Sequence, residues 1–190
     1  MPFELESQRL GITQLSSEYA EQVQEYLVRN RYFFQRYMPR WPQAFCQLEN
    51  IQLRLNEEKW LQQQGRFIRY YIFHRSDKQK NRIIGDISYS HFIYGAMRSC
   101  FLGYKVDQSF NNLGVATESL RLLNPETIQR FDLQRIEAHI MPKNKGSRHL
   151  IEKLGFELEG IAKQFICING QWEDHCRYAF VKGLNQEEFY

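Results

Sequence analysis

The chain has 190 residues, of which 43% are hydrophobic and 15% aromatic, and a chain of this length buries one hydrophobic core. No apolar run approaches the ~20 residues that a membrane-spanning helix needs, and the first ten residues contain no basic or apolar stretch of the kind that directs secretion. We therefore expect a single domain over residues 1–190, in the cytoplasm and with no membrane partner. The net charge of +3 is too small to indicate a nucleic-acid binder.

The cysteines and histidines show no metal-binding or redox spacing, so no metal site is expected. Cys167 and Cys176 flank an Asn169-Gly170 turn, which sets the register of a hairpin. In that register Cys167 faces Trp172 and Cys176 faces Lys163, so a disulfide between the two cysteines is not expected.

The N-terminal part of the chain predicts a strand over residues 8–15 and then a helix over 17–29, with Ser16-Ser17 as its cap. Residues 29–41 interleave four arginines with five aromatics and contain no acid. Two interpretations of this segment remain open. Its aromatics can fill the core while its arginines stay in water, or it can form a substrate-side rim that contacts a peptide or an anion.

A polar helix is expected over residues 48–64, with Gly65 ending it. Three antiparallel strands follow, because each segment is rich in β-branched and aromatic residues and is bounded by turn residues. They are Phe67–His74, Arg82–Phe92 and Ser99–Val106.

The junction between residues 102 and 117 carries the first functional signal. A strand runs into Asn111-Asn112-Leu113-Gly114, and Val115-Ala116-Thr117 is typical of the first turn of a helix. Such a turn presents unpaired backbone N–H groups at the positive end of the helix dipole, and so it binds anions. A glycine before a helix is also common in plain turns, so the motif alone leaves both interpretations open.

The helix after this junction contains Pro125, which predicts a kink or break near Leu123-Asn124. A strand is expected over 134–141, and Asn144 can cap a helix over 145–154. Two last strands pair through the Asn169-Gly170 turn: residues 157–168 and 171–181.

Three segments in this order resemble the GNAT superfamily of N-acetyltransferases: LGYKVDQSFNNLGVATESL (102–120), RIEAHIMPKNKGSRHLIEKLGFELEG (135–160) and INGQWEDH (168–175). Together they resemble the RimJ/RimL group, which acetylates alanine N-termini of ribosomal proteins. The resemblance implies an α+β acyl-CoA N-acyltransferase fold, with a mixed, mostly antiparallel sheet of about seven strands flanked by helices. It also implies acetyl-CoA as the acetyl donor.

The resemblance implies that the cofactor lies against the strand over residues 99–106, the loop over 111–114 and the starts of the helices at 115 and 145. The implied cofactor-binding residues are Tyr104, Val106, Asn111, Asn112, Leu113, Gly114, Val115, Ala116, Thr117, Asn144 and Ser147. The family loop usually reads Q-G-x-G-x-A/G, where this chain has Asn111 and Asn112. Asparagine tolerates left-handed backbone geometry better than any residue except glycine, so we expect the loop to keep its shape.

Acetyl transfer to an amine needs a base, and an α-amino group with a pKa of about 7.7–8.0 needs only a mild one. Glu137 and His139 share a strand face. His139 is the candidate base and Glu137 its rival, and a structural pairing with a neighbour is the alternative for each. Ser147 resembles the group that protonates the leaving thiolate, but it can equally be a helix cap. The glutamate base of some relatives would fall near Phe165-Ile166, so it is missing here.

The acceptor follows from the resemblance alone, and it is a protein N-terminus, such as that of a ribosomal protein. A small amine, such as a polyamine or an amino sugar, is the rival acceptor, and a non-catalytic CoA-binding, ribosome-associated factor that contacts RNA is the rival function. An open groove beside residues 29–41 would favour a peptide, and a closed acidic pocket would favour a polyamine.

Asp174 and His175 are adjacent in a strand, so they point to opposite faces and do not form a dyad.

Overall fold

The computed structural model describes residues 2–183, so residues 1 and 184–190 of the expected domain lie outside the described part. The helices are α1 (Ala20–Phe34), α2 (Leu48–Gln63), α3 (Val115–Arg130) and α4 (Lys145–Lys153), with short 3-10 helices η1 (Ser17–Tyr19), η2 (Gln43–Cys46) and η3 (Gln108–Phe110). The strands are β1 (Leu5–Glu6), β2 (Leu10–Thr13), β3 (Phe67–His74), β4 (Gly85–Ile93), β5 (Ser99–Val106), β6 (Arg135–Ile140), β7 (Glu157–Ile168) and β8 (Gln171–Val181).

All eight strands form one sheet in the order β1-β2-β3-β4-β5-β6-β8-β7. Only the β5–β6 pair is parallel, because α3 connects the two strands as a crossover. The mixed, mostly antiparallel sheet is therefore confirmed, with one strand more than the seven expected. The additional strand is β1, which has two residues and is too short to show alternation in the sequence.

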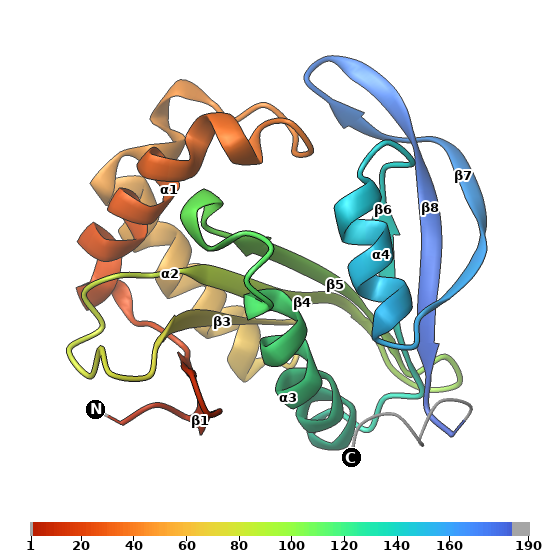
Figure 1. Ribbon diagram of the computed structural model, residues 1–190, viewed down its shortest axis with the longest axis horizontal. Helices are drawn as coiled ribbons and strands as arrows, with labels where there is room; N and C mark the ends of the chain where they lie inside the picture. Colours follow the sequence, from red (N-terminus) through yellow and green to blue (C-terminus); the bar gives the residue numbers. More distant parts are fainter. Residues whose placement is uncertain (1, 184–190) are drawn as a thin grey trace.

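The sheet divides in its middle. β5 and β6 pair only from Ser99 to Leu102 on one strand and from Arg135 to Ala138 on the other, and both strands continue beyond the paired part. Figure 1 shows the two halves diverging, with α1 and α2 beside β3–β5 and α4 in front of β6 and β8. Beyond the last pair, β5 and β6 no longer pair with each other, although β5 still pairs with β4 and β6 with β8.

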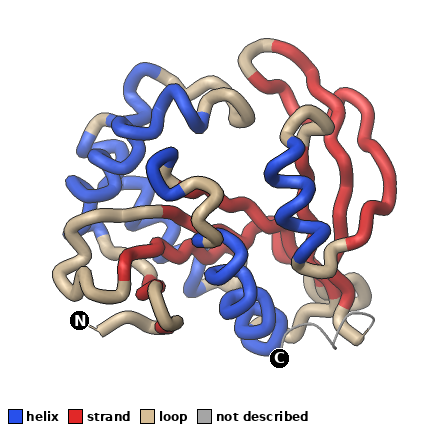
Figure 2. The backbone as a smooth tube through the Cα atoms, in the orientation of Figure 1, coloured by secondary structure: helices blue, strands red, loops and turns tan. Residues whose placement is uncertain are grey.

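Two hydrophobic clusters cover the two faces of the sheet. The larger one packs α3 and α4 against the middle strands, and the other packs α1 and α2 against β3. Figure 2 shows the helices on either side of the sheet. None of the described helices is long and apolar enough to cross a bilayer.

Helix α1 extends five residues beyond the expected end at residue 29. Phe34 lies one heptad after Leu27, so the buried helix face continues into the aromatic segment. Phe34 and Trp41 are buried in the cluster under α1, whereas Tyr32 is 88% exposed. The core-filling interpretation of residues 29–41 therefore holds for some of its aromatics and not for others.

Three details of the first strand and of the helices differ from expectation. β2 is shorter than residues 8–15, and Ser16 makes no side-chain capping hydrogen bond, since η1 precedes α1. The predicted break near Leu123-Asn124 is wrong, because α3 is continuous across Pro125. Pro125 lies on the exposed face together with Arg121, whose carbonyl loses its partner and can bind water instead.

The β7–β8 hairpin has the bounds expected from the sequence, and Cys167 faces Trp172 as predicted. The prediction that Cys176 faces Lys163 is wrong. Cys176 pairs with Ile161 because a bulge in β7 shifts the register. Both cysteines are free thiols, so the expectation of no disulfide is confirmed.

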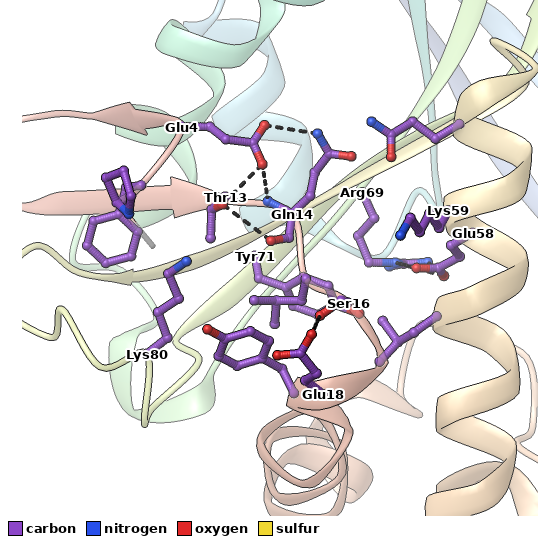
Figure 3. Close-up of a pocket in the computed structure, with 16 residues that line it drawn as sticks. Glu4, Thr13, Gln14, Ser16, Glu18, Glu58, Lys59, Arg69, Tyr71 and Lys80 are labelled. Atoms are coloured by element: carbon purple, nitrogen blue, oxygen red, sulfur yellow. Dashed lines mark hydrogen bonds and ion pairs between the residues drawn. The ribbon is translucent and has the colours of Figure 1, made fainter.

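A groove with a volume of about 670 Å³ lies at the β1–β2 edge of the sheet, beside α2 (Figure 3). Its acids are already bound, since Glu4 accepts hydrogen bonds from Gln14 and Glu58 pairs with Arg69. The groove shares no residue with the functional residues predicted from the sequence.

Candidate active site

The loop before α3 has the left-handed turns that a phosphate-binding loop needs. Gly114 has φ +79° and Asn112 has φ +60°, whereas Asn111 is extended at φ −66°. The tolerance of asparagine for left-handed geometry is therefore used at Asn112. The departure from the family pattern leaves the two turns of the loop in place.

The first turn of α3 leaves its backbone donors free. The first helical hydrogen bond runs from the N–H of Glu118 to the carbonyl of Gly114 at 2.9 Å. The N–H groups of Val115, Ala116 and Thr117 have no hydrogen-bond partner within residues 2–183. Together with the positive end of the α3 dipole, these donors fit the pyrophosphate of acetyl-CoA.

Arg9, which the sequence did not single out, lies beside this loop. Its Nη2 donates to the carbonyl of Leu113 at 3.1 Å, and its Nε donates to Oε2 of Glu118 at 2.8 Å. A Cβ atom added to Gly114 would lie 3.3 Å from the same guanidinium. Arg9 therefore holds the loop against the start of α3, and the Glu118 carboxylate balances its charge.

The cap at the start of α4 is made by Asn144 and not by the hydroxyl of Ser147. Oδ1 of Asn144 accepts from the N–H of Ser147 at 3.2 Å, so Asn144 is the cap, as predicted. The hydroxyl of Ser147 is free for another role, and it hydrogen-bonds the phenol of Tyr104 on β5. Burial raises the pKa of Tyr104, so this phenol keeps its proton at neutral pH. Val106 lies two residues further along β5, on the same face as Tyr104.

Glu137 and His139 lie on one face of β6, as predicted. Oε2 of Glu137 is 3.6 Å from Nε2 of His139, which is too long for a hydrogen bond. The Glu137 carboxylate accepts from Arg135 at 3.0 Å and from Arg177 at 3.4 Å. Structural pairing with Arg135 and Arg177 therefore describes Glu137.

His139 has a different environment from Glu137. The centroid of its ring lies 4.5 Å from that of Phe101 and 4.8 Å from that of Phe165, and its nearest charged partner within the described part of the chain is Glu137 at 3.6 Å. Burial lowers the pKa of His139 below its ordinary 6.5, in opposition to the Glu137 carboxylate, which raises it. The imidazole is therefore neutral at pH 7 and has a lone pair available.

The candidate catalytic residues lie on opposite faces of the divided sheet. Phe101 and Tyr104 are three residues apart on β5, so they point to opposite faces. Phe101 contacts His139, and Tyr104 contacts Ser147. The imidazole and the hydroxyl pair therefore flank the point where β5 and β6 separate.

Five rings form a continuous ladder on the His139 face, and four of them were not among the predicted site residues. The centroid distances are 5.0 Å for His91–Phe101, 4.5 Å for Phe101–His139, 4.8 Å for His139–Phe165 and 5.9 Å for Phe165–His175. The rings come from β4, β5, β6, β7 and β8. Each strand shows only alternation in the sequence, so the register between strands is needed to find the ladder.

The expectation that Asp174 and His175 form no dyad is confirmed. Asp174 accepts from Nζ of Lys163 at 2.7 Å and from the N–H of Gln164 at 2.9 Å. His175 is buried and contacts the carbonyl of Glu173 instead.

A model of the acetyltransferase (GNAT) domain matches residues 9–157, which is most of the chain. The chain belongs to the GNAT family of acetyltransferases. This GNAT protein is thus an N-acetyltransferase that uses acetyl-CoA as its donor, as the resemblance implied.

Relatives and a solved structure place this GNAT protein in the RimJ/RimL group. It is 36% identical to the probable N-acetyltransferase YjcK of Bacillus subtilis over 77% of this chain and 79% of that one. It is 31% identical to the ribosomal protein uS5-alanine N-acetyltransferase of Escherichia coli over 90% and 87%. The crystal structure of the ribosomal-protein-S5-alanine acetyltransferase of Vibrio fischeri superposes with a TM-score of 0.88 at 26% identity, covering 94% of this chain and 96% of that one.

Proposed function

We propose that this acetyltransferase acetylates the α-amino group of a protein N-terminus, and that a ribosomal protein in the cytoplasm is its acceptor. The names of the relatives support a ribosomal protein. The whole of residues 1–190 is assigned to one N-acetyltransferase domain, since one sheet runs from β1 to β8.

One observation favours a peptide over a polyamine. The carboxylates on the His139 face are already paired: Glu137 with Arg135 and Arg177, Glu159 with Arg135 at 2.6 Å, and Glu173 with Lys143 at 2.6 Å. A polyamine keeps a second ammonium group in the bound state, and a buried ammonium needs a carboxylate partner. The N-terminus of a peptide carries only the amine that reacts.

The unpaired backbone N–H groups at the start of α3 indicate where acetyl-CoA would bind. The N–H groups of Val115, Ala116 and Thr117 would bind the pyrophosphate, and Asn112, Leu113 and Gly114 would let the backbone approach it. The remaining cofactor-binding residues of the proposal line the route from the loop to α4: Tyr104, Val106, Asn111, Asn144 and Ser147.

Acetyl-CoA supplies an acetyl thioester, whose C–S bond breaks as the amine nitrogen bonds to the carbonyl carbon. His139 accepts the proton that the amine loses, because its imidazole is neutral at pH 7. On the other face, the hydroxyl pair of Ser147 and Tyr104 donates a proton to the leaving sulfur. Glu137 lies close enough to stabilise the imidazolium that forms on His139.

A comparison of acceptors tests the proposal. The enzyme is incubated with acetyl-CoA and one of four acceptors: an alanine-first peptide, the same peptide with a blocked N-terminus, spermidine or glucosamine. Thiol release is then followed. We expect turnover only with the free N-terminus. Faster turnover of spermidine or glucosamine would refute the peptide acceptor, and CoA binding without turnover of any acceptor would indicate the non-catalytic alternative.

A further inference from the structure

His175 is a buried histidine that the reaction described above does not use. The residue is only 3% exposed. Its Nδ1 lies 3.0 Å from the carbonyl oxygen of Glu173, and a carbonyl can only accept. Nδ1 therefore carries a hydrogen, and in this tautomer the lone pair lies on Nε2. Within residues 2–183, this contact of Nδ1 is the hydrogen bond that the His175 ring makes, and Nε2 makes none.

His175 lies on the same face as the candidate base. His139 on β6 pairs with Arg177 on β8, and residues two apart on a strand share a face. The ring of Phe165 contacts both imidazoles, at 4.8 Å and 5.9 Å. Because Arg177 lies opposite His139, His175 is displaced from His139 by two residues, or ~7 Å, along the direction of β8.

The offset from His139 to His175 points toward residues 29–41, the segment considered above as a substrate-side rim. The β6–β8 ladder ends at Ile140 and Cys176, so His175 lies beyond it, on the way to the hairpin turn. At that turn, Nδ2 of Asn169 donates to the carbonyl of Gln35 at 2.8 Å, just after the end of α1. A chain that leaves His139 past His175 therefore runs toward the contact between the hairpin turn and α1.

We propose that Nε2 of His175 accepts a hydrogen bond from a backbone N–H of the acceptor peptide. An extended peptide advances ~7 Å over two residues, so an α-amine at His139 brings the N–H of the third residue level with His175. This inference rests on the proposed function, and it names a subsite that reads the peptide main chain. A small amine has no such N–H group, so His175 contributes to the choice of a peptide.

N-methylated peptides test this subsite directly. The acceptors are an alanine-first peptide and three copies with an N-methyl group on the amide of residue 2, 3 or 4. For wild-type enzyme we expect methylation at residue 3 to raise KM by roughly 3- to 12-fold, the equivalent of one net hydrogen bond. In His175→Ala, KM for the unmodified peptide should rise by the same factor, and methylation at residue 3 should add nothing.

Two further variants separate binding from folding. His175→Gln keeps a side-chain acceptor, and it should retain part of the methylation penalty. His91→Ala removes the exposed imidazole at the other end of the ladder, and it should leave KM unchanged. The kcat of His175→Ala with the unmodified peptide should stay within threefold of wild type, because the base is intact.

The outcomes distinguish this inference from the proposed function. If wild-type enzyme acetylates the peptide but the methylation penalty at residue 3 is the same in His175→Ala and His175→Gln as in wild type, the subsite is refuted and the peptide acceptor stands. A loss of kcat and melting temperature with KM unchanged would also refute it, as a structural role. If wild-type enzyme acetylates only small amines, both proposals are wrong.

Discussion

The imidazole Nε2 of His139 lies 3.6 Å from Oε2 of Glu137, and that carboxylate is also bound by Arg135 and Arg177. The two residues therefore differ in what they can do, although they share a strand face. The Glu137 carboxylate is held by two guanidinium groups. His139 is partly buried between two phenyl rings, and this burial lowers its pKa, so the imidazole is neutral at pH 7.

Replacing His139 should therefore impair catalysis and leave cofactor binding intact. A positioned general base contributes typically ~10²–10⁴-fold to the rate, so His139→Ala should lower kcat by about that factor. The affinity for CoA, measured by calorimetry, should not change. Glu137→Gln should lower kcat less than His139→Ala does, because it removes a charged neighbour of His139 and leaves the base in place. A His139→Ala enzyme within threefold of the wild-type kcat would contradict the assignment.

The pH dependence should show a base with a lowered pKa. The base acts when deprotonated, so kcat/KM should fall as pH falls through the pKa of His139, with a midpoint below 6.5 because burial lowers that pKa. The limb should be absent in His139→Ala and should move to still lower pH in Glu137→Gln, where the raising effect of the carboxylate is lost. The α-amino group of the peptide adds its own limb near pH ~8 in both enzymes, so a wild-type profile with no further limb below 6.5 would contradict the role of His139.

The phosphate loop can be tested with matched glycine variants. Gly114 and Gly95 have similar backbone angles, φ +79° and φ +76°, so an alanine at either position carries a similar strain. Only Gly114 lies at the start of α3. We expect Gly114→Ala to weaken CoA binding and Gly95→Ala to leave it unchanged, with similar losses of melting temperature. Equal CoA affinities in the two variants would remove the loop from cofactor binding.

The hydroxyl pair on the other face should act in the departure of the thiol. Tyr104→Phe removes the partner of Ser147, so kcat should fall by part of the ~10²–10⁴-fold that a positioned acid supplies. Tyr70→Phe is the control, since Tyr70 is a buried phenol on β3 that accepts from Arg130. Steady-state kinetics with a saturating peptide would show the difference, and equal kcat values in the two variants would rule out a role for Tyr104.

The cap of α4 should be measurable as stability. Asn144→Ala removes the hydrogen bond to the N–H of Ser147, and loss of such a cap costs about 0.5–2 kcal/mol of unfolding free energy. Ser16→Ala is the control, because Ser16 precedes η1 without a capping hydrogen bond. Urea unfolding should show a loss for Asn144→Ala and almost none for Ser16→Ala. The reverse order would mean that Asn144 does not stabilise the helix start.

Much of the fold could be predicted from short stretches of sequence. The bounds of β3, β5, β7 and β8 agree with the prediction, because alternation and turn residues act within a few positions. The Asn144 cap and the left-handed Asn112 were predictable for the same reason. The Pro125 prediction failed because the sequence does not show that the freed carbonyl faces water.

The sequence by itself determined the family, the loop, the cap and the shared face of Glu137 and His139, since each depends on residues close together in the chain. Tertiary structure alone decided how those parts meet. Arg9 reaches Glu118 across 109 positions, and the five-ring ladder exists only because five strands, with a register shift at His91 and another at Phe165, lie in one sheet. Alternation tells which side a residue takes within its own strand, but hydrogen bonding between strands decides which residues become neighbours.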